Sequence, residues 1–299
     1  ILFLFLVKPY AALIQFISPK GNEIDVISRQ IANAHTGFNL VMTLIWIPLI
    51  PLMVKIVMKL VPDGKEMGAK ALENPNYLDN KLIAQPAAAL QLVAKEVMYC
   101  AKIVDEMIGK LQSGNGKIDK ENAGIVEEKA KILQKLYASI NDYFAALYSG
   151  GVLTEEQASQ SAGMQSILCD IDRIGQLTRE IMETVAKQNK GKHKYSKEAL
   201  KELKKAMEQI QMIYGSCIRA ISGNVDIKEL MRQKEDIMQL DEKMRKNHIA
   251  RVGKGKCDSK LTIPFNDVLH NIDRIGNSCV NLVEVAKENV TMQAFFAED

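Results

Sequence analysis

The sequence has few cysteines and no excess of one charge, and each shortage excludes a class of protein. Its five cysteines are far apart and form no CxxC pair, which argues against a disulfide framework and a zinc site and fits a reducing compartment. Its 39 lysines and arginines against 36 aspartates and glutamates leave a net charge of only +3. A strongly basic protein that binds nucleic acid is therefore excluded.

The sequence also lacks an arrangement of residues typical of an active site. None of its four histidines occurs in an HExxH or HxH motif. The glycine-containing stretch GNGK (114–117) lacks the preceding strand and the Lys-Ser/Thr pair that a phosphate-binding loop needs. We therefore expect no enzymatic activity and no cofactor in this part of the protein.

Charged residues are scarce near the N-terminus, and this scarcity indicates a membrane segment. Residues 31–54 are 24 consecutive positions without Asp, Glu, Lys or Arg. A helix of that length reaches about 36 Å, which is enough to cross a bilayer core of about 30 Å. Pro48 and Pro51 would break a soluble helix, but a membrane helix tolerates them as kinks. We therefore predict a transmembrane helix in contact with the lipid bilayer.

The flanking residues predict how this helix is oriented. Lys55 and Lys59 follow the apolar run, so the positive-inside rule places residues 62–299 in the cytoplasm. Residues 1–17 are also apolar, are interrupted by Lys8-Pro9, and begin with Ile. We expect that the sequence starts inside a further membrane helix and is an N-terminally truncated fragment of a multi-pass protein of the cytoplasmic (inner) membrane.

Two polar residues stand out within the apolar run, His35 and Asn39. Their i, i+4 spacing places them on one helix face. Polar side chains in a membrane helix are costly and usually face other helices or a water-filled cavity. The alternative is that both lie near the outer headgroups and only cap the helix.

The remainder of the chain has the pattern of an all-α bundle. Residues 62–80 form a linker rich in Gly, Pro and Asn, and glycine-containing breaks then separate six long helical patterns. No segment shows the two-residue alternation of a strand. The predicted helices are 81–112, 118–148, 154–188, 195–222, 225–250 and 261–296. The fold class is therefore all-α, with membrane helices in 1–61 and a six-helix bundle in 81–299.

An internal repeat organises this bundle. The sequence IDRIG occurs at 171–175 and again at 272–276, an offset of 101 residues, and the apolar positions around it recur at the same offset. Spacings of four and three residues make one buried face per helix. We therefore predict two three-helix repeats, 81–188 and 195–297, in one antiparallel bundle. The matched positions are Ile167, Ile171, Ile174, Thr178, Ile181 and Val185 in one repeat and Val268, Ile272, Ile275, Cys279, Leu282 and Ala286 in the other.

Asp172-Arg173 and Asp273-Arg274 lie beside this stripe at matching places. One interpretation is a structural Asp–Arg pair at the edge of each core. The other is a carboxylate site for a metal ion or for a basic residue of a partner. Because few further carboxylates lie nearby, we favour the structural interpretation.

The motifs resemble those of a known family. The segment RQIANAHTGFNLVMTLIWIPLIPLMVKIVMKLVPD (29–63) resembles the last transmembrane part of bacterial sodium-dependent phosphate cotransporters. The tandem that follows, with its run at 77–104 and two IDRIG helices, is similar to the PhoU-like domain at the C-terminus of many members. The resemblance implies sodium-coupled transport of inorganic phosphate, with Na⁺ and phosphate as the transported ions and a cytoplasmic regulatory domain.

The resemblance also bears on site residues. The family's Gln-Ser-Ser motifs, where sodium and phosphate bind, do not occur in this sequence, so the principal ion-binding residues would lie upstream of Ile1. His35 and Asn39 match a motif shared across the family. Whether they line the transport path or only pack against it stays open.

PhoU-like domains often bind metal clusters through carboxylates spaced i, i+4 on the second and third helices of each repeat. This pattern is eroded here. On the third helices only Asp172 and Asp273 remain, with Gln176 and Asn277 at i+4. A hard cation or an iron cluster needs several anionic oxygens, so we predict no metal cluster. On the second helices the alignment places Ala130 and Gln134 in one repeat, and Lys234 and Met238 in the other.

Other functions are weighed against transport. A membrane-tethered PhoU-like regulator or scaffold of phosphate homeostasis would dock on partner proteins without transporting phosphate, and would need almost no membrane sequence before Ile1. A signalling receptor would need a phosphoacceptor histidine. His248 lacks the expected context for that role, so we expect it at the surface or at a helix end. A homo-oligomer or a regulatory protein partner is compatible with either leading function.

Overall fold

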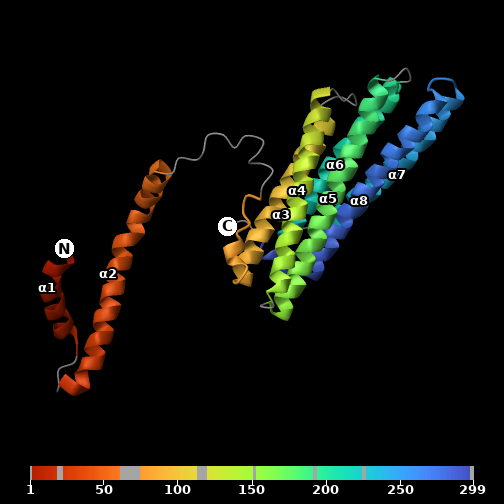
Figure 1. Cartoon of the computed structure of the whole chain (residues 1–299). Helices are drawn as coiled ribbons and strands as arrows, with labels where there is room; N and C mark the ends of the chain where they lie inside the picture. The colour runs from red at the N-terminus through yellow and green to blue at the C-terminus, as the bar shows by residue number, and fades with distance from the viewer. Residues whose placement is uncertain are drawn as a thin grey trace. The chain divides into compact units, whose positions relative to one another are not determined.

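The computed structural model describes residues 2–18, 23–60, 75–112, 120–150, 153–190, 194–223 and 227–296. Over these residues every regular element is helical, which confirms the predicted all-α class. The chain divides into two compact units, Ile1–Met67 and Gly68–Asp299 (Figure 1). Each unit is described separately below.

The first unit is a pair of helices, α1 (Leu2–Ile17) and α2 (Glu23–Leu60). The Tyr10 hydroxyl of α1 donates a hydrogen bond to the Ala34 carbonyl of α2, and the Asn33 amide donates to the Ser18 hydroxyl at 3.0 Å. A Cβ atom at Gly37 would lie 3.0 Å from the Tyr10 hydroxyl oxygen, so a small residue is needed where the helices meet. These contacts define the face of α2 that packs on α1.

Within the described residues, one stretch is long and apolar enough to cross a membrane, the 27 residues Ile27–Met53 of α2. It overlaps almost all of the predicted span 31–54, and Pro48 and Pro51 lie inside the helix. Its large apolar side chains are exposed in this unit, with Trp46 45% accessible. An exposed apolar surface of this kind is typical of contact with lipid or with further protein.

The second unit is a bundle of long helices. Its start and end points agree with the predicted ones within a few residues, except at the two ends of the bundle. The helices are α3 (Pro86–Gln112), α4 (Lys120–Ser149), α5 (Glu155–Lys190), α6 (Lys197–Ile221), α7 (Ile227–Gly253) and α8 (Thr262–Glu288). Short helical turns accompany them at η1 (Asn80–Leu82), η2 (Ser259–Leu261) and α9 (Val290–Gln293).

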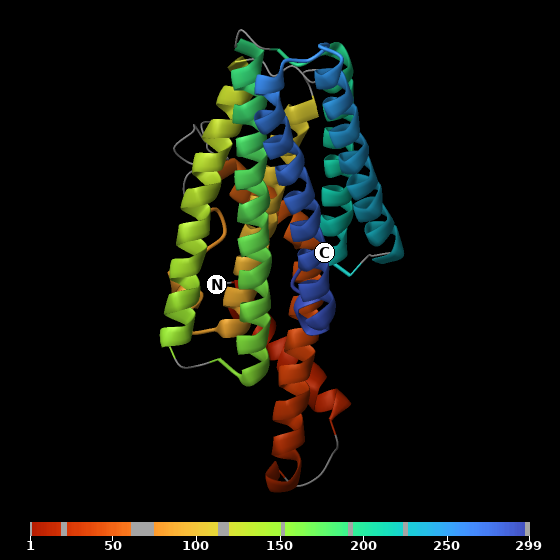
Figure 2. The same ribbon diagram turned by 90° about the vertical axis from the view of Figure 1, so that its right-hand side faces the viewer.

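The long helices pack as two groups of three. Helices α3, α4 and α5 contact one another, as do α6, α7 and α8, and the groups join through α3 with α6 and α5 with α8. Figure 2 shows α5 and α8 side by side, with α4 and α7 on opposite flanks. The bundle therefore consists of two three-helix repeats, and α5 and α8, which carry the IDRIG motifs, share its most extensive contact.

The repeated apolar stripe forms the centre of this core. All twelve of its matched positions, from Ile167 to Val185 and from Val268 to Ala286, are at most 2% exposed. At Thr178 the hydroxyl donates to the Ile174 carbonyl at 2.7 Å, so this buried polar group is satisfied within its own helix. The i, i+3/i+4 periodicity thus identified the buried face in both repeats.

The C-terminus departs from the prediction. The last long helix was expected to run to residue 296, but α8 ends at Glu288. The Asn289 amide donates to the Val285 carbonyl at 3.0 Å, and the Gln293 amide donates to the Ala286 carbonyl at 2.8 Å. These side chains satisfy carbonyls that a helix end leaves without partners. The chain then turns back, and we call residues 289–296 the C-terminal hook.

The start of the bundle also differs from the prediction. The first long helix was expected at residue 81, but Asp79 caps the short turn η1 by accepting the Lys81 N–H at 2.9 Å, and α3 begins at Pro86. Proline is favoured at the first position of a helix, because the N–H that it lacks would have no partner there. Most of the predicted linker 62–80 lies outside the described residues.

Candidate functional site

Three polar residues of α2, His35, Asn39 and Thr43, form a stripe. The Asn39 amide nitrogen lies 3.1 Å from His35 Nδ1, and the Thr43 hydroxyl donates to the Asn39 carbonyl at 2.8 Å. All three side chains are exposed in this unit. Since an amide nitrogen only donates, Nδ1 of His35 is the acceptor, which leaves Nε2 to carry the ring proton.

The stripe lies away from α1. At 3.6 residues per turn, His35, Asn39 and Thr43 fall about 180° around α2 from the face that contacts α1. Asn39 is also within one residue of the middle of the apolar stretch Ile27–Met53. Polar groups at such a depth in a bilayer need a partner helix or water. Thr43 was not singled out in the sequence, although its i+8 spacing from His35 was the available signal.

In the bundle, the structure shows what the lone aspartates contact. The Gln176 amide donates to Asp172 at 2.5 Å, and the Asn277 amide donates to Asp273 at 3.3 Å. The amides at i+4 therefore hydrogen-bond the carboxylates that precede them. Burial raises the pKa of Asp172, and the hydrogen bond from Gln176 opposes that shift.

Asp273 also contacts Lys234. Among the described residues, its counterpart Asp172 in the first repeat has no such further partner. Lys234 Nζ lies 2.5 Å from Asp273 Oδ1 and 3.3 Å from the Asp273 carbonyl oxygen, and Lys234 is 8% exposed. The favoured structural interpretation expected each aspartate to pair with an adjacent arginine. The observed partners are instead an amide and a lysine. Side chains of consecutive helix residues diverge, so they are poorly placed to pair.

The glycines of the two IDRIG motifs reveal the register of the second helices. A Cβ atom at Gly175 would meet Leu133 of α4, and one at Gly276 would meet Lys234 of α7. Lys234 therefore occupies the place of Leu133, not that of Ala130 as the sequence alignment had it. A shift of three residues keeps nearly the same helix face, so periodicity alone could not fix the register.

Metal binding stays untested. Among the residues that the structure describes, no group of three or more His, Cys, Asp or Glu side chains is arranged to hold a metal ion. The prediction that the bundle binds no metal cluster therefore stays a prediction. Iron analysis of the purified protein would decide it, and more than one metal ion per chain would contradict it.

Glu96 of α3 is a buried carboxylate that the sequence analysis missed. It is 0% exposed, and its Oε2 accepts the N–H of Tyr77 at 2.7 Å. Burial raises its pKa, while the N–H groups of Tyr77, Asn76 and Leu78 oppose that shift. Glu96 therefore anchors the chain that enters α3. A charged residue next to Val97 on an apolar helix face was the signal available in the sequence.

His248 was expected at the surface or at a helix end, and this is wrong. It is 1% exposed, and its ring stacks on Phe265 of α8 at 4.5 Å with an interplanar angle of 15°. Its Nε2 lies 3.2 Å from the Thr262 hydroxyl. Nearby, Arg251 pairs with Glu202 of α6 at 2.8 Å. The residue therefore belongs to the packing between α7 and α8, where it has no access to a phosphate donor.

We expect His248 to make the bundle sensitive to acid. Burial and the nearby Arg251 lower the pKa of His248, so the folded protein holds it neutral, whereas the unfolded chain takes up a proton near pH ~6.5. Above that pH, His248 is neutral in both states and the free energy of unfolding is unaffected. As the pH falls below it, protonation of His248 in the unfolded chain lowers the free energy of unfolding. Urea unfolding at a neutral and a mildly acidic pH, compared with His248→Gln, measures the effect.

The wild type should lose more stability on acidification than the His248→Gln variant. The buried Glu96 and the partly buried Asp170 and Asp172, whose pKa values desolvation raises, are common to both proteins and cancel in the comparison. If the free energy of unfolding changed equally with pH in the two proteins, His248 would not be buried as described.

Known proteins give one further observation. No protein-family model matches the chain. It is 23% identical over 248 residues to the "Putative inorganic phosphate export protein YjbB" of Salmonella typhimurium, a match that covers 80% of this chain and 45% of the relative. It is 22% identical over 224 residues to the protein of the same name in Escherichia coli, covering 73% of this chain and 40% of the relative. The chain thus spans less than half the length of the curated relatives it matches, and by sequence it is weakly homologous to proteins named for inorganic phosphate export.

Proposed function

We propose that this chain is part of a membrane protein that transports inorganic phosphate. The observation that carries the proposal is the weak homology to proteins named for phosphate export, which runs over 80% of the chain. The exposed apolar stretch Ile27–Met53 supports a location in a membrane. The polar stripe on α2 supports a path for a hydrated or charged solute, since polar side chains in a membrane helix usually face other helices or a water-filled cavity.

Two finer features belong to the same proposal. Transport is coupled to sodium, as the resemblance of residues 29–63 implies, and the stripe His35–Asn39–Thr43 faces the transport path. The helical bundle regulates transport from the cytoplasm. The name of the relatives specifies export, whereas sodium coupling in the resembled family drives phosphate inward, so the direction has to be measured.

Flux measurements test the proposal in separate steps. The complete gene product, reconstituted in proteoliposomes, should move labelled phosphate faster than protein-free vesicles do. A sodium gradient should change the rate when a potassium gradient does not. Phosphate flux that does not depend on the sodium gradient would contradict sodium coupling but would still support phosphate transport. Absence of flux in a folded, inserted protein would overturn transport itself.

The stripe predicts which residues matter for this flux. The double variant His35→Leu/Asn39→Leu should lower it about tenfold, the effect of losing interactions worth roughly 1.4 kcal/mol in the rate-limiting step. Ile45→Ala, at an exposed apolar position of the same helix, is the control and should transport normally. Equal flux in the double variant and the control would assign the stripe a packing role.

A second candidate function is a membrane-tethered regulator without transport. The observation that favours it is that the bundle forms a compact unit with its own core, Gly68–Asp299. Such a protein would bind a partner through this unit. It would give no phosphate flux in proteoliposomes, whereas deletion of its gene would still change phosphate uptake in cells.

A further inference from the structure

A groove runs between the first helices of the two repeats, on a face of the bundle that the proposed function does not use. Helices α3 and α6 form its walls, and the C-terminal hook contributes Phe295 and Phe296. Its volume is about 910 Å³. Small-molecule sites are mostly apolar hollows of about 300–1,000 Å³ with a few convergent polar groups, and this groove has that size.

The sequence explains why the hollow exists. Ala94 and Ala101 of α3 and Gly215 of α6 lie in the wall, and such small side chains leave space between two packed helices. A Cβ atom at Gly215 would meet only the end of the Arg219 side chain, at 3.6 Å. Besides the buried Tyr214, four aromatic residues line this space, Tyr77, Tyr99, Phe295 and Phe296. The groove therefore offers flat apolar surfaces to a ligand.

The groove carries more positive than negative charge. Lys95 and Lys102 line it from α3, are exposed, and have no carboxylate partner among the described residues. The guanidinium of Arg219 lies beside the wall at Gly215 and contacts the Ser216 hydroxyl at 3.2 Å. The one carboxylate of the groove, Asp105, accepts a hydrogen bond from the Gln211 amide.

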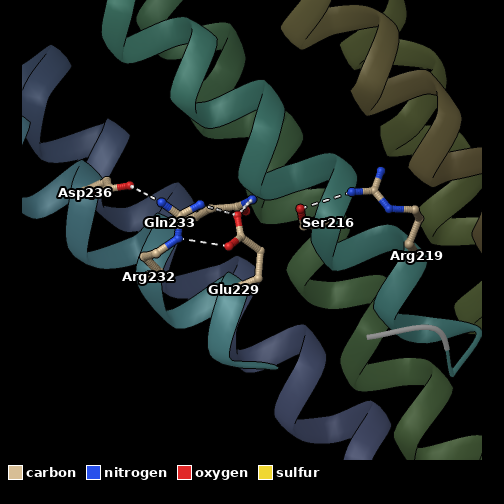
Figure 3. Close-up of polar contacts among 6 residues, drawn as sticks. All are labelled: Ser216, Arg219, Glu229, Arg232, Gln233 and Asp236. Carbon is tan, nitrogen blue, oxygen red and sulfur yellow. Dashed lines mark hydrogen bonds and ion pairs between the residues drawn. The ribbon is translucent and has the colours of Figure 1, made fainter. Parts of the chain in front are cut away.

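Several cations elsewhere in the bundle are paired with carboxylates. Figure 3 shows the contrast at the neighbouring α6–α7 corner. Arg232 is held by both oxygens of Glu229 at 2.7 and 2.9 Å and lies 3.9 Å from Asp236. Arg219 contacts the Ser216 hydroxyl and no carboxylate of the described residues. Lys129 and Lys246 likewise contact Glu106 and Glu242. The three cations at the groove are thus left available for an anionic ligand.

We propose that this groove binds a nucleotide. The base would lie against the aromatic rings, since every nucleobase has a π-face that stacks on an aromatic side chain. The phosphates would lie between Lys95, Lys102 and Arg219, which act as point charges or as a planar fork. A ligand in this place contacts both repeats and the C-terminal hook, so its binding is able to change how the two repeats are held together.

Equilibrium binding of labelled ATP to the full chain in detergent tests this proposal independently of any transport. We expect saturable binding of one ATP per chain, displaced by other nucleotides but not by equal concentrations of inorganic phosphate. The double variant Lys95→Glu/Lys102→Glu should weaken binding by about tenfold or more. Lys201→Glu/Lys205→Glu, which reverses two exposed lysines elsewhere on α6, should bind ATP as the wild type does.

A second variant tests the aromatic wall. Tyr99→Leu removes a ring without a charge change and should weaken ATP binding while leaving the unfolding midpoint near that of the wild type. No binding at millimolar ATP, or equal binding by the wild type and the charge-reversed groove variant, would overturn the proposal. Binding of phosphatidylglycerol to the chain in detergent in place of ATP, lost in the groove variant, would also overturn it and identify a lipid headgroup as the ligand.

Discussion

Replacing Gly175 by valine should lower the free energy of unfolding of the bundle by about 1–3 kcal/mol, because the added side chain overpacks the core and forces neighbouring side chains out of their preferred rotamers. Any Cβ atom at this position would lie 2.4 Å from Leu133 Cδ2 and 3.3 Å from Val104 Cγ2. Both neighbours are at most 1% exposed and belong to the core, so neither has free space to move into. The close approach of α4 and α3 to α5 therefore depends on this glycine.

Two other glycines serve as controls. Gly124 of α4 has no atom within 4 Å of its Cβ position, so Gly124→Ala should raise stability by roughly 0.5–1 kcal/mol through helix propensity. Gly276→Val would meet the Lys234 side chain, at 3.1 Å, whose flexible stem can shift, and should be less harmful than Gly175→Val. Urea unfolding followed by far-ultraviolet circular dichroism measures all three. A Gly175→Val protein as stable as the wild type would contradict the described packing.

Replacing Glu96 by leucine should lower the free energy of unfolding by about 2–4 kcal/mol. The change leaves the N–H of Tyr77 and its neighbours without the acceptor that Oε2 provides at 2.7 Å, and a buried N–H that loses its partner costs about 1–3 kcal/mol. The segment that leads into α3 would also detach from the bundle. Proteolysis of the folded protein near residues 76–78 should therefore become faster.

Glu96→Gln is the matched control, because it keeps an acceptor oxygen and removes the charge. Burial raises the pKa of Glu96, so ionising it at neutral pH reduces stability, and a neutral amide avoids that loss. We expect Glu96→Gln to unfold within about 1 kcal/mol of the wild type. Equal destabilisation by glutamine and leucine would show that the charge, not the acceptor, is what the fold needs.

Periodicity and charge explain why so much of the bundle could be predicted. The stripe from Ile167 to Val185 repeats at Val268 to Ala286, and a helix that buries one face requires such spacing whatever it packs against. The apolar run of α2 was equally clear, because no charged residue interrupts positions 31–54. These features are local properties of one helix each.

What escaped prediction depends on contacts between helices. The burial of Glu96 and His248 follows from which segments pack over them, and neighbouring residues do not specify that. Lys234 takes the place of a leucine, so the register of α7 became visible only through Gly276. The groove between α3 and α6 arises from small residues on two helices that are distant in sequence, together with a C-terminal hook that helix periodicity did not indicate.

The candidate transport site was likewise predicted only in part from the sequence. His35 and Asn39 were visible as polar residues in an apolar run, and the structure adds Thr43 and the orientation of the stripe away from α1. The match to the relatives covers less than half of their length. His35, Asn39 and Thr43 are the groups on one face of α2 that we propose for a transport path.

The central claim, that inorganic phosphate crosses the membrane through this protein, is tested most directly by loading proteoliposomes that contain the complete gene product with labelled phosphate and following its release. The account predicts release faster than from protein-free vesicles, saturating with phosphate concentration and competed by unlabelled phosphate but not by sulfate. Release no faster than from protein-free vesicles, by a protein shown to be folded and inserted, would contradict it.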